Sequence, residues 1–69
     1  MDMEIGEEIG VIKDVTLKFR DRVTFTYDGD IRIGTAVKVK GYAILMNDDD
    51  RDGKIRSFSG VKIHNLLVL

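Results

Sequence analysis

Residues 23–30 read Val-Thr-Phe-Thr-Tyr-Asp-Gly-Asp, and this stretch decides the fold class. The first five residues alternate apolar and polar side chains and are rich in strand formers, which predicts a strand with one buried face. Asp28-Gly29 supplies the positive φ that tight hairpins require, so Asp28-Gly29-Asp30 predicts a turn. The stretch therefore predicts a β-hairpin.

Outward from this hairpin, the C-terminal part of the chain keeps the strand pattern. The second strand is predicted over residues 31–40, and Gly34 within it predicts a bend or bulge. Further strands are predicted over residues 42–46, 54–59 and 61–64, with Gly41, a polar acidic turn over 47–53, and Gly60 between them. Alternation along the second strand predicts that one face carries Ile31, Ile33, Val37 and Val39 and the other carries Arg32, Lys38 and Lys40.

The N-terminal part fits two patterns. Apolar residues from Ile5 to Phe19 recur at spacings of three and four, which favours a helix over part of residues 7–20. Gly6 and Gly10 each weaken a helix by about 1 kcal/mol. The alternation from Val11 to Phe19 fits a strand as well, so the rival prediction is a first strand over residues 14–20.

Together these patterns predict a mostly β fold, either a small meandering sheet or a closed five-stranded barrel, with a short N-terminal helix as an option. With 69 residues the chain holds one domain, 1–69, in which residues 23–69 form the barrel and 1–20 the N-terminal segment. A domain this small often needs extra stabilisation. Leu66–Leu69 is apolar on both faces, so we expect self-association through it or burial under the N-terminal segment.

Composition excludes several classes of function. With no cysteine and one histidine, disulfides, thiolate metal sites and a zinc site are excluded, and no cofactor is expected. No apolar run approaches the roughly 18 residues of a membrane span, and the acidic start lacks the features of a signal peptide. We therefore expect a cytoplasmic protein without membrane contact. The net charge of −1 hides local basic excess, because residues 15–47 carry six basic and three acidic side chains.

Catalytic patterns are weak in this chain. His64 stands in an apolar strand, and no nucleophile, carboxylate pair or phosphate-cradling glycine loop accompanies it. We therefore expect a binding protein and not an enzyme. The acidic turn places Asp48, Asp50, Asp52 and Gly53 as in the start of an EF-hand calcium loop. The twelfth place holds Ser59 where a glutamate is required, so we favour an acidic hairpin tip over a calcium site.

Basic and aromatic residues supply the candidates for binding. Arg56 offers a planar fork suited to phosphate, and Lys62, beyond Gly60, adds a point charge. Tyr27 and Tyr42 offer faces for base stacking. Arg32 shares its predicted face with two lysines that could follow a phosphate backbone. The alternative interpretation makes the tyrosines core and rim residues and leaves the charges solvated.

The C-terminal half carries a family resemblance. Gly41-Tyr42-Ala43 begins a strand, and Arg56-x-Phe58-x-x-x-Lys62-Ile63 follows the acidic turn. This pattern resembles the WYL domain, whose first strand is similar to Val23-x-Phe25-x-Tyr27. The family's Trp and Leu are replaced here by Gly41 and Ala43.

The resemblance implies a small Sm-like or SH3-like β-barrel, and stand-alone short versions occur in phage genomes. It also implies that Tyr42, Arg56, Lys62 and Arg32 bind a nucleotide or single-stranded nucleic acid, as in a protein that senses or sequesters a nucleotide signal. The alternative is a protein-interaction or self-assembly module, which would dock on a host protein or on itself through a sheet edge or through Leu66–Leu69.

Overall fold

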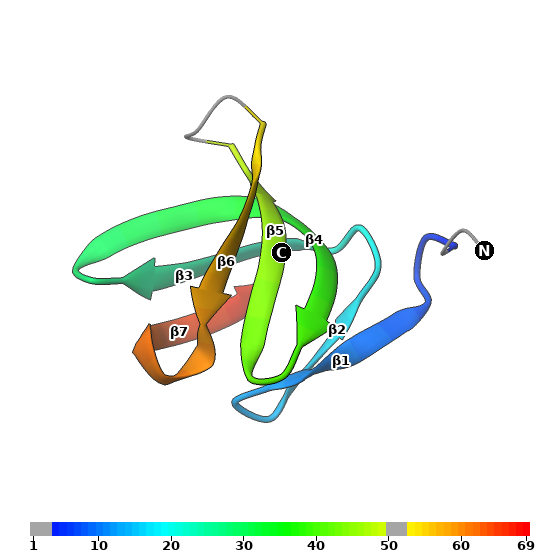
Figure 1. The fold of residues 1–69 in the computed structure, drawn as a ribbon, viewed down its shortest axis with the longest axis horizontal. Helices are drawn as coiled ribbons and strands as arrows, with labels where there is room; N and C mark the ends of the chain where they lie inside the picture. The colour runs from blue at the N-terminus through cyan, green and yellow to red at the C-terminus, as the bar shows by residue number, and fades with distance from the viewer. Residues whose placement is uncertain (1–3, 50–52) are drawn as a thin grey trace.

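The computed structural model describes residues 4–49 and 53–69, which form seven strands and one 3₁₀ helix (Figure 1). The strands are β1 (Glu8–Ile12), β2 (Val15–Lys18), β3 (Arg22–Tyr27), β4 (Asp30–Lys40), β5 (Ala43–Asp48), β6 (Ile55–Ser59) and β7 (Ile63–Val68), and the 3₁₀ helix η1 (Gly60–Lys62) precedes β7. The predicted mostly β fold is confirmed. None of the described elements is a helix with the length and hydrophobicity needed to cross a bilayer.

Five strands form one antiparallel sheet in the order β6-β5-β4-β3-β7, and β1 and β2 form a separate hairpin. The sheet curls, and the hairpin packs against β4 (Figure 1). Within the described residues β6 pairs only with β5 and β7 only with β3. The sheet is therefore open, and the closed barrel expected from the sequence is not formed.

The N-terminal segment is a β-hairpin, so the predicted helix over residues 7–20 is wrong. Lys13 and Asp14 have φ values of 49° and 65°, which make the two-residue turn that joins β1 to β2. Gly10 allows close packing on β4, since a Cβ there would lie 2.7 Å from Cβ of Val39. The rival prediction of a strand over 14–20 is close to β2, Val15–Lys18.

The β3–β4 turn fixes which side chains face inward. Asp28 and Gly29 have φ values of 51° and 83°, as a two-residue hairpin turn requires, and Tyr27 pairs with Asp30. Directly paired residues share a face, so Arg32 lies inward beside Phe25.

The predicted faces of the second strand are therefore wrong in its first half. Ile31 and Ile33 face outward and are 69% and 38% exposed, whereas the Arg32 side chain is only 15% exposed. An irregularity between Ala36 and Lys38 shifts the register, after which Val39 packs against the core as predicted.

One hydrophobic core joins the sheet and the hairpin. Ile12 and Leu17 of the hairpin are fully buried and belong to a core to which every strand of the sheet contributes a buried residue. The rings of Phe25 and Phe58 pack edge to face with their centroids 5.3 Å apart. The rings of Tyr27 and Phe58 pack in the same way, with a centroid distance of 5.0 Å. The buried apolar residues are Ile12, Leu17, Val23, Phe25, Ala36, Ile44, Met46, Phe58, Ile63 and Leu66.

Candidate ligand-binding pocket

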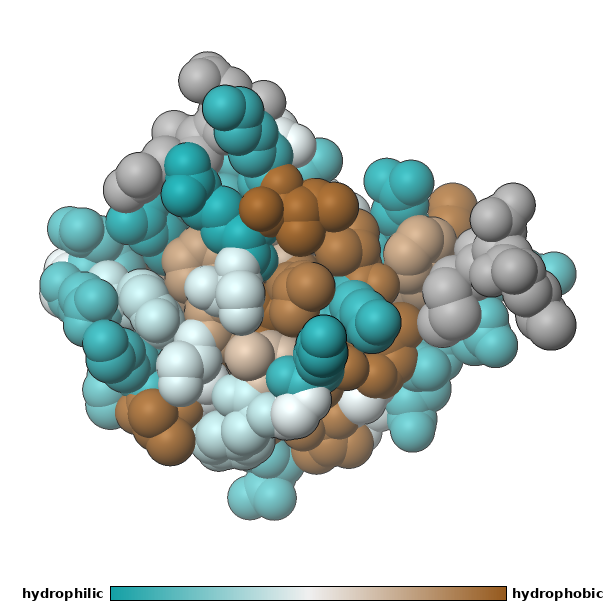
Figure 2. Space-filling view, in the orientation of Figure 1, coloured by the Kyte–Doolittle hydropathy of each residue, from teal (hydrophilic) through white to brown (hydrophobic). Residues whose placement is uncertain are grey.

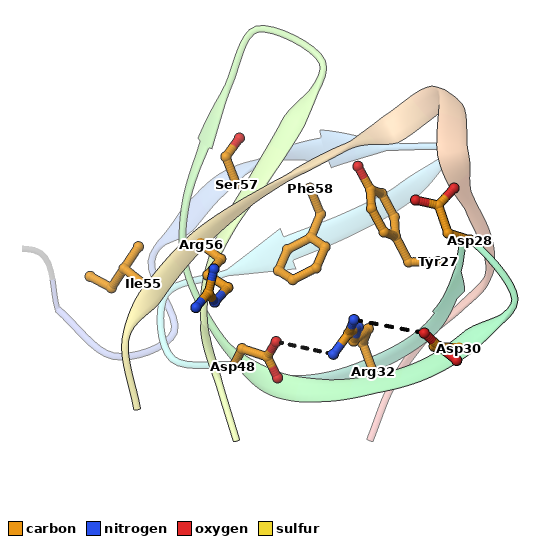
Figure 3. Close-up of a pocket in the computed structure, with 9 residues that line it drawn as sticks. All are labelled: Tyr27, Asp28, Asp30, Arg32, Asp48, Ile55, Arg56, Ser57 and Phe58. Carbon is orange, nitrogen blue, oxygen red and sulfur yellow. Dashed lines mark ion pairs between the residues drawn. The ribbon is translucent and has the colours of Figure 1, made fainter. Parts of the chain in front are cut away.

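A pocket of about 450 Å³ lies where the inner face of the sheet meets solvent (Figure 3). It opens between the β3–β4 turn and β6, and its volume is within the range of small-ligand sites. Its lining residues are Tyr27, Asp28, Asp30, Arg32, Asp48, Ile55, Arg56, Ser57 and Phe58.

Strand register explains why charged residues line this end of the sheet. Arg56 is paired with Met46, which is fully buried, and Arg32 is paired with Phe25 in the core. Asp48 follows Met46 by two residues on β5, so it shares the same face. The inner face is thus apolar over most of its length and ends in a charged layer.

Arg32 lies between two carboxylates. Its Nη1 is 3.7 Å from Oδ2 of Asp48, and its Nη2 is 4.0 Å from Oδ2 of Asp30. Asp48 is fully buried, and the Arg32 Nε is also buried, without a hydrogen-bond partner among the described residues. A buried charge is costly unless an opposite charge accompanies it, so most of the Arg32 charge is compensated within the protein.

Arg56 differs from Arg32 in its surroundings. It is exposed, and none of the ion pairs or hydrogen bonds found between described side chains involves it. Figure 3 shows Arg56 on the β6 side of the pocket and Asp28 and Asp30 on the opposite side, at the β3–β4 turn. Arg56 is therefore the cation that a ligand in this pocket would meet first.

Tyr27 and Phe58 form the apolar wall between these two sides. The ring of Tyr27 packs edge to face against Phe25 and Phe58, and its hydroxyl accepts a hydrogen bond from the Ser59 N–H at 3.4 Å. Phe58 is 5% exposed. The wall thus offers ring edges and partly covered faces to a ligand, whereas the sequence suggested a free face of Tyr27 for stacking.

Tyr42 and Lys62 lie outside the pocket. Tyr42 is 49% exposed at the β4–β5 turn, and its ring covers Gly60, where a Cβ would lie 2.7 Å from Cε2 of the ring. Its carbonyl accepts a hydrogen bond from the Gly60 N–H at 2.7 Å. Lys62 is exposed at the end of η1. Of the five residues predicted to bind a ligand, the structure brings together Tyr27, Arg32 and Arg56.

The predicted row of basic side chains is also divided. Arg32 faces inward, whereas Lys38 and Lys40, which follow the register shift, are exposed. The predicted face is therefore wrong for Arg32 alone, because the hairpin turn fixes Arg32 inward and the irregularity between Ala36 and Lys38 then shifts the register of β4.

Sequence reasoning missed the acidic members of the pocket. From the sequence, Asp28 and Asp30 are predicted only to form a turn, and Asp48 only to belong to an acidic turn. Over the described residues, the pocket lining has three carboxylates, Asp28, Asp30 and Asp48, and two guanidinium groups, Arg32 and Arg56. Since Arg32 and Asp48 compensate each other, the pocket is polarised, with an acidic turn facing one exposed arginine. Figure 2 shows hydrophilic residues covering the β3–β4 turn on the face it draws.

The EF-hand-like stretch falls only partly within the described residues. The Asp48 carboxylate faces inward to Arg32, whereas a calcium loop requires its first ligand to point into the loop. Asp50 and Asp52 lie outside the described residues. Over residues 4–49 and 53–69, no group of three His, Asp or Glu side chains is placed to hold a metal ion.

Comparison of the chain with models of known protein families, with curated proteins and with solved structures gives no match. An assignment of function therefore starts from the pocket's own geometry and charge.

Proposed function

We propose that this chain is a non-enzymatic binding domain and that its pocket takes a nucleotide, with the phosphate on Arg56. The observation that supports this most directly is the exposed guanidinium of Arg56, which pairs with none of the described side chains and lies across an aromatic wall from two carboxylates. A guanidinium fork is well suited to a phosphate group.

The remaining parts of the pocket suit the rest of a nucleotide. Tyr27 and Phe58 provide apolar contact for a planar base. The carboxylates of Asp28 and Asp30 accept hydrogen bonds, and sugar hydroxyls and base amino groups are donors. A nucleotide would thus place its charged end near β6 and its neutral, donor-rich end near the β3–β4 turn.

The same charges favour a small nucleotide over single-stranded nucleic acid. A polymer brings a phosphate for every nucleotide, and binding it requires a continuous basic path. Here Asp28 and Asp30 interrupt such a path, and Tyr42 and Lys62 are not in the pocket. Of the two ligands expected from the sequence, we therefore propose the nucleotide.

The WYL-like interpretation remains part of this proposal. Two residues of the resembling pattern, Arg56 and Phe58, line the pocket, while Lys62 lies outside it. An antiparallel meander from β3 to β6, followed by η1 and a last strand that returns to β3, is compatible with an Sm-like or SH3-like relationship.

Calorimetric titration of the intact protein with the common ribonucleotides at low salt tests the proposal. We expect Arg56→Ala to weaken binding at least about tenfold, as loss of a charge-assisted phosphate contact should. Lys62→Ala is the matched control, because it also removes an exposed cation but lies outside the pocket. Absence of binding, or equal losses in the two variants, would refute the proposal.

A second candidate is a protein-interaction module, and exposed apolar residues on the outer face of the sheet favour it. Thr24 pairs with both Ile33 and Leu67, and these two apolar residues are 38% and 59% exposed. Ile31 adds to this outer face. Edge strands such as β6 and β7 can also accept another strand.

The C-terminal apolar strand contributes to this face on one side only. Leu66 is buried in the core, whereas Leu67 and Leu69 are 59% and 69% exposed. Light scattering over a range of protein concentration tests self-association. If this second candidate is correct, a Leu67→Lys variant should be monomeric where the wild type is not, and a wild type that stays monomeric throughout counts against self-assembly.

A further inference from the structure

We propose that the pocket selects a nucleoside monophosphate over the corresponding triphosphate by charge. This inference rests on the proposed nucleotide binding and specifies the ligand class. It follows from how many cations and anions the pocket presents and from where they lie.

Among the residues that the structure describes, the pocket lining presents one available cation. The guanidinium of Arg32 is flanked by Asp48 at 3.7 Å and Asp30 at 4.0 Å, and its side chain is 15% exposed. Arg56 is exposed and lies on the other side of the pocket (Figure 3). One guanidinium matches one phosphate group, so the second and third phosphates of a triphosphate have no cation of their own among the described lining residues.

Those additional phosphates would also meet repulsion. Asp28 and Asp30 line the pocket, and Asp30 is 73% exposed on its side chain. In a well-solvated site, each unfavourable pair of charges changes affinity by up to roughly fivefold, and by less as their separation grows. Two extra phosphates at the β6 end add negative charge to a ligand that shares the pocket with both carboxylates, so they should weaken binding on the order of tenfold.

This selectivity has a signature that a structural effect does not produce. In Asp28→Asn/Asp30→Asn the side chains keep their size while two negative charges are lost. The triphosphate carries more charge than the monophosphate, so its affinity should rise more. The ratio of the two affinities should therefore fall toward one, whatever the change in overall affinity or stability. Asp14→Asn is the matched control, because Asp14 lies at the β1–β2 turn outside the pocket.

The experiment is calorimetric titration of each protein with mono- and triphosphates of the same four ribonucleosides, in EDTA so that Mg²⁺ does not neutralise the triphosphate. We expect the wild type and Asp14→Asn to prefer the monophosphate by about tenfold or more, and the double variant to prefer it about threefold or less. A wild type that binds the triphosphate equally well or better, with Arg56→Ala weakening both, overturns the selectivity and leaves nucleotide binding intact. Failure to bind any of the ligands overturns both.

Discussion

Nη1 of Arg32 lies 3.7 Å from Oδ2 of Asp48, and the two side chains join β4 to the end of β5 on the inner face of the sheet. The next residue, Asp49, contacts Arg22 at the start of β3, on the exposed side. Two successive carboxylates therefore hold two different strands, one through a buried contact and one through a solvated contact. The two contacts should respond differently to mutation and to pH.

Removing the buried cation should be costly. Arg32→Met removes the guanidinium that lies 3.7 Å from the fully buried Asp48 carboxylate, and we expect the free energy of unfolding to fall by roughly 2–4 kcal/mol. Urea denaturation measures this loss. Arg56→Met is the control, because the same change at an exposed site should cost about 0.5 kcal/mol or less. In a double-mutant cycle with Asp48→Asn the losses should be less than additive; additive losses would show that the two side chains are not coupled.

The solvated contact predicts a pH dependence. The hydrogen bond from Arg22 lowers the pKa of Asp49 below its ordinary value. A carboxylate with a lowered folded-state pKa stabilises the protein fully above its unfolded-state pKa, and the contribution is lost as pH falls through the folded-state pKa. Asp49→Asn should therefore unfold at a lower temperature than the wild type at neutral pH, and thermal scans should converge in strong acid. A difference that persists unchanged into strong acid would contradict this origin.

The paired strands β4 and β5 should not accept a side chain at position 34, where Gly34 lies opposite Asp48. A Cβ on Gly34 would lie 2.5 Å from the carbonyl oxygen of Asn47, and backbone cannot move aside cheaply. Gly34→Ala should cost roughly 2–3 kcal/mol of unfolding free energy. Gly60→Ala is the informative comparison, because its Cβ would meet the half-exposed ring of Tyr42, which can rotate away. Equal losses in chemical denaturation would contradict this account.

The hydroxyl of Tyr27 should stabilise the fold and contribute little to ligand binding. Tyr27→Phe keeps the ring that packs against Phe58 and removes the hydroxyl that accepts the Ser59 N–H. We expect a loss of about 0.5–1.5 kcal/mol in unfolding free energy and nucleotide affinity within about twofold of the wild type. A large loss of affinity with unchanged stability would assign the hydroxyl to the ligand.

Local patterns in the sequence predicted most of the strands. The alternation over residues 23–27 and the Asp-Gly turn correspond to β3 and the β3–β4 turn. The N-terminal segment was harder, because its apolar spacing fits two periods. Packing on Val39 favours a hairpin there, with Gly10 providing the room. That contact is between residues distant in sequence and has no local signature.

The pocket was predicted only in part, for a similar reason. Arg56 was recognisable from the sequence as an arginine suited to bind phosphate. In contrast, the hydrophobic pattern placed Ile31 and Ile33 inward and Arg32 outward. Counting from the two-residue turn would have reversed that assignment, since Tyr27 must pair with Asp30. The contact between Arg32 and Asp48 depends on the register between β4 and β5, so periodicity alone could not reveal it.

The number of residues in the β3–β4 turn determines which side chains of β4 face the pocket. With two residues between the strands, β4 directs Asp30 and Arg32 to the inner face. A single residue inserted at Asp28-Gly29 would exchange odd and even positions, so that Ile31 and Ile33 would line the cavity and the arginine would reach solvent. The same strands could thus line either an apolar cavity or a charged one. Insertions at this turn are an evolutionary and engineering route to a new ligand without substitution of any residue in the pocket.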